Sequence, residues 1–543
     1  MRSPLLIVLL FTCIHSYKIL VYIPKFAISH IHFMGKITDT LIDAGHDVTA
    51  LISEMDASMP DGTKKAKIVR VSPAEGANHM NTHFMEKDAT PVDIFDKDLY
   101  TYSDMVENAY HNSVSFCRQC RKLLTTPGLV ERLKNEKYDA LITEAFDNCG
   151  VGLCNLISPR ALIPVSSTMF FDPREFGVFH SLITESSALV DARLHSNLLS
   201  RINSIYMRFV MWSFYSTQEI RMKRMFDELY PGTPSLSHLI SNAAVAFSNT
   251  DPLTDFARPT ISKIIPIGGL TVANPKPLDK YWSDILSLRP QTVLVSFGSI
   301  AKSVFMSPAR KYALLNVSKT TSSKNVMHCQ AFASFPYTTF IWKYEDKSDY
   351  FASFNASKME NIVLTDWMPQ LDILADPRLS LFISHAGKAS CHEITHFGVP
   401  SLLIPIFGDQ VYNAAALAHI GVAQVFNKLD MTNADKVRGA IEEMLGNSEY
   451  KETALRIRDQ LEARPTSPVE NLVKNVEFAA RFGPSKSLRP LNLELSTIQF
   501  LGIDILLIVV ISIVFILLVI RFIIRILRSL MALTRIEKTN KME

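Results

Sequence analysis

The stretch that decides the fold is residues 379–410, LSLFISHAGKASCHEITHFGVPSLLIPIFGDQ. It begins with a short apolar run at residues 379–383, whose length is typical of a buried strand. Small residues then open a helix that ends at Gly398-Val399-Pro400, and a second apolar run follows at residues 401–404. Two strands joined by a helix predict a parallel crossover unit and therefore an α/β fold.

The same alternation of apolar runs and helical stretches extends over most of the chain. A Pro- and Gly-rich stretch at residues 256–280 divides it into two parts, which we expect to be domains at 17–255 and 281–490. Other expected strands lie at residues 18–24, 48–52, 140–143, 292–297, 338–342 and 361–364. The economical architecture is two doubly wound, Rossmann-like domains facing a cleft.

The N-terminus carries the pattern of a secretion signal. A basic start precedes ten mostly apolar residues, Leu5–Ile14, and a small residue, Ser16, follows. Ten residues are too short to cross the ~30 Å hydrocarbon core of a bilayer at ~1.5 Å per residue. We therefore predict a signal peptide at residues 1–16.

The C-terminus predicts a membrane anchor. Residues 505–520 carry no charge, and the apolar stretch at 501–521 is long enough to form a transmembrane helix. The tail at 522–543 is basic, and basic flanks of a span stay in the cytosol. This pattern predicts a single-pass type I membrane protein with a lumenal body. Lys541 is half of a dilysine retrieval signal, which favours the endoplasmic reticulum.

Composition excludes several classes of protein. The chain has 543 residues, is 48% hydrophobic and has a formal net charge of +3, so it is neither disordered nor a general nucleic-acid binder. Seven cysteines are few for a lumenal chain, so disulfides are not expected to be the main source of stability. For the Cys117-x-x-Cys120 pair we favour an ordinary structural role.

Polar and small residues that suit an anion-binding site follow the expected strand at 379–383. His385, Gly387 and Ser390 stand at a helix start, where backbone N–H groups and partial positive charge suit a diphosphate. Glu393, one turn later, is an acceptor for ribose hydroxyls. Two further features complete the site: Trp367 offers a flat face for a base, and Asp409-Gln410 suit sugar hydroxyls.

The segment from Phe382 to Gln410 resembles the signature of UDP-glycosyltransferases, especially the animal UDP-glucuronosyltransferases. The match extends to Trp367-Met368-Pro369-Gln370, and to Phe297-Gly298-Ser299. The resemblance implies a GT-B fold and a UDP-sugar as co-substrate, with no cofactor and no metal. It implies that Trp367 stacks on uracil, that Gln370 and Glu393 bind ribose, that Ser299, His385 and residues 386–390 hold the diphosphate, and that Asp409 and Gln410 hold the sugar. Ala389 departs from the pattern, since vertebrate members carry Asn there.

Glycosyl transfer to a hydroxyl needs a general base near neutrality, and histidine is the usual choice. His30, His32 and His46 are candidates, and His30 stands fifteen residues before Gly45, the spacing at which the resembled family carries its catalytic histidine. Glu144 aligns with the family's catalytic carboxylate, with Asp147 as a rival. The expected reaction is inverting transfer of a sugar, glucuronate favoured, to a small lipophilic acceptor, a conjugation typical of detoxification.

Three alternatives stay open beside this interpretation. The first is a UDP-glucosyltransferase of the same mechanism. The second is a zinc hydrolase that uses the H-E-x-x-H pattern His392-Glu393-Ile394-Thr395-His396. The third is a sugar-nucleotide binding protein without turnover. Acceptor identity and homo-oligomer formation are left open.

An anomaly lies at Val317–Gln330, VSKTTSSKNVMHCQ, which interrupts a smooth helical pattern. Deleting it restores the i, i+4 spacing of Leu314 and Phe332. We hypothesise a retained intron or a gene-model error. In that case the first of two glycosylation sequons, Asn316-Val317-Ser318 and Asn355-Ala356-Ser357, is not part of the natural protein.

Overall fold

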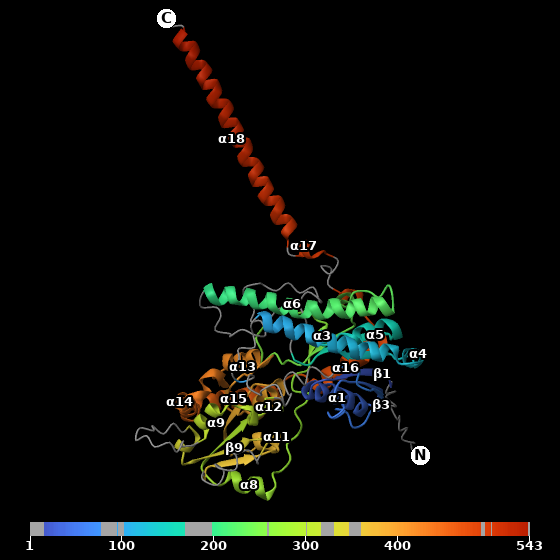
Figure 1. Ribbon diagram of the computed structural model, residues 1–543, viewed down its shortest axis with the longest axis vertical. Coiled ribbons are helices and arrows are strands. Elements are labelled where there is room, and N and C mark those ends of the chain that lie inside the picture. The colour runs from blue at the N-terminus through green and yellow to red at the C-terminus, as the bar shows by residue number, and fades with distance from the viewer. Residues whose placement is uncertain are drawn as a thin grey trace, which may run out of the picture. The chain divides into compact units, whose positions relative to one another are not determined.

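The computed structural model describes residues 16–77, 95, 102–168, 198–257, 260–299, 301–315, 331–346, 360–489, 495–500 and 502–540. Within these residues the chain forms two parallel sheets and a long C-terminal helix, α18 (Figure 1). The predicted signal peptide, the Val317–Gln330 anomaly and both sequons fall wholly or largely outside the described residues.

The first sheet has the strand order β3-β2-β1-β4-β5-β6-β7, and its neighbouring strands are parallel. Its strands are β1 (Lys18–Lys25), β2 (Asp47–Glu54), β3 (Lys67–Val71), β4 (Ala140–Glu144), β5 (Ala161–Ser166), β6 (Ala246–Ser248) and β7 (Ile264–Pro266). The order reverses between β1 and β4, so the carboxyl ends of these two strands mark the switch point where open sheets bind ligands.

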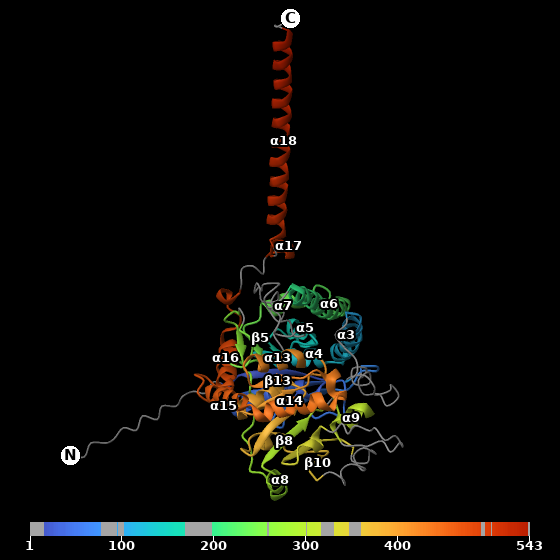
Figure 2. The same cartoon turned by 90° about the vertical axis from the view of Figure 1, so that its left-hand side faces the viewer.

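Both faces of the first sheet are covered, which explains why its strands are almost continuously apolar. Successive side chains of a strand point to opposite faces. On one face Leu20, Leu51 and Leu141 pack with helices α3 to α7. On the other face the alternate residues pack with α1 and α16. The helices are α1 (Ile28–Asp43), α3 (Tyr102–Thr125), α4 (Leu129–Asn135), α5 (Cys149–Ile157), α6 (Leu198–Leu229) and α7 (Leu236–Ser241). Helices α3 and α6 lie side by side (Figures 1 and 2).

The second sheet repeats the plan with the strand order β10-β9-β8-β11-β12-β13, also parallel. Its strands are β8 (Gln291–Ser296), β9 (Thr338–Lys343), β10 (Ile362–Thr365), β11 (Leu379–Ser384), β12 (Ser401–Leu403) and β13 (Ala423–Val425). Its helices are α8 (Lys280–Leu286), α9 (Pro308–Leu314), α11 (Gln370–Leu374), α12 (Lys388–Phe397), α13 (Gln410–His419), α14 (Ala434–Gly446) and α15 (Ser448–Glu462). The switch point here lies between β8 and β11.

Two segments depart from the expected division of the chain. Strand β7 lies within residues 256–280, the stretch assigned to an interdomain connection, and pairs with β6 as the last strand of the first sheet. Helix α16 (Pro468–Phe482) falls within the range assigned to the second domain, yet Leu472, Val476 and Ala479 pack into the core of the first sheet. The chain therefore returns to the first sheet after completing the second.

Residues 489–543 form a separate compact unit. Its described helices are α17 (Thr497–Phe500) and α18 (Ile503–Asn540). Within α18, the range Ile503–Leu533 is long and apolar enough to cross a membrane, and an 18-residue stretch of it has a mean hydropathy of 3.4. This agrees with the predicted anchor, although the apolar helix extends beyond the expected end at residue 521.

Candidate active site

His30 and Glu144 meet at the switch point of the first sheet. His30 lies in the first turn of α1, just after β1, and Glu144 is the last residue of β4, the strand beside β1. Both side chains are buried, and His30 Nδ1 lies 3.1 Å from Glu144 Oε2. A carboxylate at Nδ1 holds the imidazole in one orientation and leaves Nε2 for proton transfer.

Ser167 is a third member of this cluster that the sequence did not reveal. Its Oγ lies 2.6 Å from His30 Nδ1, so the hydroxyl and the Glu144 carboxylate contact the same ring nitrogen. Ser167 follows β5, and its carbonyl accepts a hydrogen bond of 2.8 Å from Asn249 Nδ2. The serine is 137 residues from His30 in the chain, and no local motif marks it.

Aromatic rings enclose the imidazole. Phe26 and Phe146 lie with their ring centroids 4.5 and 5.4 Å from that of His30. The two phenylalanines stack on each other at 5.5 Å, and Phe116 meets Phe26 edge to face. These aromatic side chains lower the local dielectric constant and so strengthen the electrostatic interaction between His30 and Glu144.

Asp147, the rival carboxylate, has other partners. It accepts a 2.6 Å hydrogen bond from the Tyr22 hydroxyl and one of 3.1 Å from the Cys149 backbone N–H. Burial raises the pKa of Asp147 to about 7, against the lowering effect of the Tyr22 bond. Asp147 therefore supports the loop after β4, and Glu144 is the carboxylate that contacts His30.

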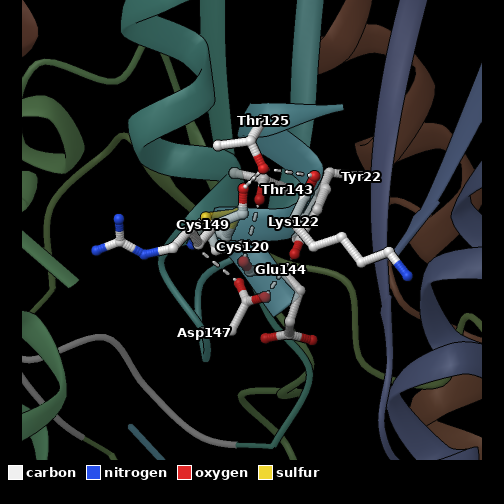
Figure 3. Close-up of a disulfide and its surroundings, with 9 residues drawn as sticks. Tyr22, Cys120, Lys122, Thr125, Thr143, Glu144, Asp147 and Cys149 are labelled. Carbon is white, nitrogen blue, oxygen red and sulfur yellow. Dashed lines mark hydrogen bonds between the residues drawn. A yellow bond between two sulfur atoms is a disulfide. The ribbon is translucent and has the colours of Figure 1, made fainter. Parts of the chain in front are cut away.

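A disulfide fixes the same loop. Cys120 in α3 is bonded to Cys149, the first residue of α5, and Figure 3 shows the bond beside Asp147 and Glu144. Cys117 of the Cys117-x-x-Cys120 pair is a free thiol, which agrees with a structural role rather than a metal or redox pair. The bridge closes a loop of 29 residues and connects the helix layer to the strand end that carries Glu144.

The other two histidine candidates lie elsewhere. His32 is exposed on α1. His46 precedes β2 at the amino edge of the sheet, where its ring nitrogens lie near Tyr17 N and the Glu477 carboxylate. Of the three candidate histidines, only His30 is seen to contact Glu144 among the described residues.

The second cluster surrounds the turn between β11 and α12. Ala386 adopts a left-handed conformation with φ 64°, held by Asn413 Nδ2, which donates to its carbonyl, and by Ser384 Oγ, which accepts from its N–H. This conformation costs a non-glycine residue about 1–2 kcal/mol. It turns the chain into the start of α12, where free N–H groups accumulate.

His385 is wedged between two glycines. A Cβ on Gly298 or Gly387 would lie 2.6 or 2.7 Å from the imidazole ring, so neither position has room for a side chain. Burial, helped by the charge of Lys343, lowers the pKa of His385 to about 4 and keeps the ring neutral. Its buried Nδ1 has no hydrogen-bond partner within the described part of the chain. Such an orphaned atom fits a site that a ligand completes.

Of the residues expected to bind the nucleoside, Gln370 begins α11, Glu393 lies on α12, and Trp367 precedes α11. Gln370 Nε2 donates to Glu393 Oε2 at 2.6 Å and approaches Ser390 Oγ at 3.3 Å. Burial raises the pKa of Glu393 to about 7. The Trp367 side chain is 67% exposed, so its face is accessible to a planar ligand.

Asp409 and Gln410 lie at the start of α13, and their side chains have different partners. Gln410 Oε1 accepts bonds from the N–H groups of Ile406 and Phe407, so this side chain shapes the loop before it. Asp409 accepts from Asn413 Nδ2 at 2.8 Å, and burial raises its pKa. Ser299 stands exposed at the end of β8.

The two clusters influence each other although they belong to different sheets. Burial raises the pKa of Asp409, and Lys388 and, less strongly, His30 act against this rise. Lys388 Nζ pairs with Asp255 Oδ2 at 3.5 Å across the two sheet regions, and Arg464 pairs with Asp251 at 2.8 Å. The predicted base and the predicted sugar-binding carboxylate are therefore within electrostatic reach.

The H-E-x-x-H residues have separate partners. His392 Nε2 lies 3.3 Å from the Asn249 carbonyl, and Glu393 is bound by Gln370. Burial lowers the pKa of His392 to about 3. Within the described ranges no group of three or more His, Cys, Asp and Glu side chains is arranged to hold a metal ion.

Comparison with known proteins relates the chain to UDP-sugar-dependent transferases over almost its whole length. The family model described as "UDP-glucoronosyl and UDP-glucosyl transferase" matches residues 17–534. The Caenorhabditis elegans protein "Putative UDP-glucuronosyltransferase ugt-48" is 28% identical over 510 residues, which is 91% of each chain. Human "UDP-glucuronosyltransferase 3A1" is 28% identical over 485 residues, 85% of this chain and 84% of the human one.

Solved structures agree in fold. The glycosyltransferase VinC in complex with DTDP superimposes with a TM-score of 0.53 at 14% identity, covering 86% of this chain and all of that one. The calicheamicin glycosyltransferase CalG4 gives 0.56 at 13% identity, with coverages of 87% and 100%. At such low identity the likeness shows the GT-B fold alone.

Proposed function

We propose, since the chain belongs to the family of UDP-glucuronosyl and UDP-glucosyl transferases, that it transfers glucuronate from UDP-glucuronate to a hydroxyl of a small lipophilic acceptor, with inversion. The family establishes a glycosyltransferase that uses a UDP-sugar. The donor sugar, the acceptor and the roles of individual residues are our proposal.

The observation that carries the proposal is the contact between His30 Nδ1 and Glu144 Oε2 at the switch point of the first sheet. Both hydrogen bonds of the ring to described residues use Nδ1, which leaves Nε2 for the substrate. As the acceptor oxygen attacks the anomeric carbon, its proton passes to Nε2. The bond from that carbon to the phosphate oxygen breaks, and UDP leaves with the electron pair.

For the donor, we assign the diphosphate to the turn before α12. Main-chain N–H groups at a helix start, a left-handed Ala386 and the orphaned Nδ1 of His385 together suit an anion. Gly387 belongs to this turn and Ser390 to the first turn of α12, and we assign Ser299, which follows β8, to the same anion. Trp367 would stack on the uracil, and Gln370 and Glu393 would bind the ribose. Because these groups can carry the diphosphate charge, we expect EDTA to leave the transfer rate unchanged.

Asp409 and the amide of Gln410 would bind the sugar. Glucuronate has a carboxylate that favours a nearby cation, and Lys388, which acts against the rise in the pKa of Asp409 and pairs with Asp255, supplies one in this region. Two curated relatives also carry the name UDP-glucuronosyltransferase. These observations favour glucuronate over glucose.

We further propose that α18 anchors the protein as a single-pass type I membrane protein, with the body in the lumen of the endoplasmic reticulum. The apolar segment of α18 and the basic residues that follow its uncharged part support this topology. A lumenal body also suits the Cys120–Cys149 disulfide.

The experiment is to incubate membranes that contain the full-length chain with labelled UDP-glucuronate or UDP-glucose and a phenolic acceptor. The proposal predicts a labelled conjugate from UDP-glucuronate at a clearly higher rate than from UDP-glucose. The reverse preference would identify a glucosyltransferase. Binding of UDP without product from either donor would instead favour a sugar-nucleotide binding protein.

A further inference from the structure

Helix α18 is longer than a bilayer requires. The helix runs from Ile503 to Asn540, 38 residues, which at 1.5 Å per residue is about 57 Å, against a hydrocarbon core of about 30 Å. The uncharged residues 505–520 already account for about 24 Å. The part that begins at Arg521 therefore starts near the boundary of the hydrocarbon core, and the rest of the helix extends beyond it.

This second part of α18 is amphipathic. Arg521, Arg525 and Arg528 follow each other at i, i+4 and i+7, so they share one face of the helix. Arg535, two heptads after Arg521, repeats the same register in the sequence. The remaining faces carry large apolar side chains that are exposed in the structure: Phe522, Ile523, Ile524, Ile526, Leu527, Leu530, Met531 and Leu533.

Apolar side chains in such number are unfavourable in water. Phe522 is 64% and Leu527 52% exposed, and transfer of such side chains from water to an apolar environment is favourable. A helix with an arginine face and a broad apolar face is the type that lies in the interface of a bilayer, with the apolar face at the acyl boundary. A free cytosolic tail would leave that face in water.

We propose that the arginine face formed by Arg521, Arg525 and Arg528, where α18 continues beyond its uncharged part, binds anionic phospholipid headgroups of the leaflet next to the basic end of α18. Charge complementarity selects this occupant: from Ile505 to Ile536 the sequence has four arginines and no acidic residue. Arginine forks match phosphate geometry, and basic residues beside a span attract anionic lipids. This part of α18 thus binds anionic lipids in preference to neutral ones, in addition to anchoring the chain.

The test uses the full-length protein in nanodiscs of equal phosphatidylcholine and phosphatidylserine, released and analysed by native mass spectrometry for retained lipid. Wild type should retain more phosphatidylserine than phosphatidylcholine. The triple variant Arg521→Gln, Arg525→Gln, Arg528→Gln should lower the ratio of the two at least about fivefold, the factor for one charge near an anionic surface. The triple Lys variant at the same positions should keep it.

A matched control removes three exposed charges from the body, Lys65→Gln, Lys67→Gln and Lys280→Gln, and should retain lipid as wild type does. The inference would be overturned if the wild-type protein retained both lipids equally, a result that requires no variant. It would also be overturned if the Gln variant kept the wild-type ratio of the two lipids. The inference rests on the proposed anchoring but not on the proposed transfer reaction. Sugar transfer measured on the same samples therefore distinguishes a failure of the lipid inference from a failure of the proposed transfer reaction.

Discussion

The two polar clusters, one at each sheet's switch point, are organised differently. In the first, the side chains already bind one another: His30 contacts Glu144 and Ser167, and Asp147 is held by Tyr22. In the second, polar groups remain accessible or unsatisfied, such as the exposed Trp367 and the orphaned Nδ1 of His385. We infer that the first cluster is preorganised for proton transfer and that the second is completed by its ligand.

This difference predicts that substitutions in the first cluster reduce turnover without changing nucleotide affinity. Substitutions in the second should change affinity first. A substitution that affected both quantities equally would show that the clusters do not have separate roles.

The largest effects are expected in the first cluster, where Glu144→Gln removes the carboxylate beside His30. An amide in place of the carboxylate can donate to Nδ1, which favours the wrong tautomer of His30, and it no longer stabilises the imidazolium, so kcat should fall by about 10²- to 10⁴-fold. UDP affinity should stay at the wild-type value. Steady-state kinetics and UDP titration measure both quantities.

The control for this change is Asp147→Asn at pH 6. Because the pKa of Asp147 is about 7, its carboxyl is mostly protonated at that pH, and the amide replaces it with little loss. A larger loss of kcat for Asp147→Asn than for Glu144→Gln would show that the wrong carboxylate has been paired with His30.

Removing the disulfide with Cys120→Ala and Cys149→Ala should lower the free energy of unfolding by about 3–4 kcal/mol, the value for a loop of this length. The measurement is the urea midpoint of the full chain in detergent. Cys117→Ala, which removes a free thiol one turn from Cys120, should change it little. Equal midpoints with and without the bridge would mean that other contacts fix the loop after β4.

The pH dependence of UDP binding tests the second cluster. The pKa of Glu393 is about 7, and ribose hydroxyls would donate to its ionised form. Binding then favours deprotonation, so affinity should rise about tenfold between pH 6 and pH 8 as the carboxyl ionises. Titration of wild type and Glu393→Gln separates this effect from ionisation of the nucleotide itself. A pH dependence that persists unchanged in Glu393→Gln would exclude Glu393 from the nucleotide site.

The smallest effect is expected for Ser167→Ala. One hydrogen bond to Nδ1 is lost while Glu144 remains, so kcat should fall about two- to tenfold with KM for the UDP-sugar unchanged. Ser167→Thr keeps the hydroxyl and should restore most of the rate. Loss of rate in the Thr variant equal to that in Ala would point to packing rather than the hydroxyl.

The parts of the fold with a strong local pattern were predictable from the sequence. Apolar runs such as those of β1, β8 and β11 are long enough to identify. Strands β6, β7 and β13 have three residues each, and a period cannot be recognised in so few. The sequence thus missed these three strands and the edge strand β3, whereas it predicted the edge strand β10 of the second sheet.

The candidate site was predictable where its residues follow strands, as His30, Glu144 and His385 do. Contacts between distant segments were not predictable. Ser167 reaches His30 only because β5 lies beside β4, and Cys120 pairs with Cys149 only because α3 packs on α5. Periodicity carries no information about such pairings.

The most direct measurement is sugar transfer by His30→Ala beside His32→Ala, two histidines of the same helix, in membranes supplied with UDP-glucuronate and a phenol. The account predicts that His30→Ala loses about 10²- to 10⁴-fold in kcat while binding UDP normally, and that the exposed His32 tolerates the change. Full activity in His30→Ala would contradict the account.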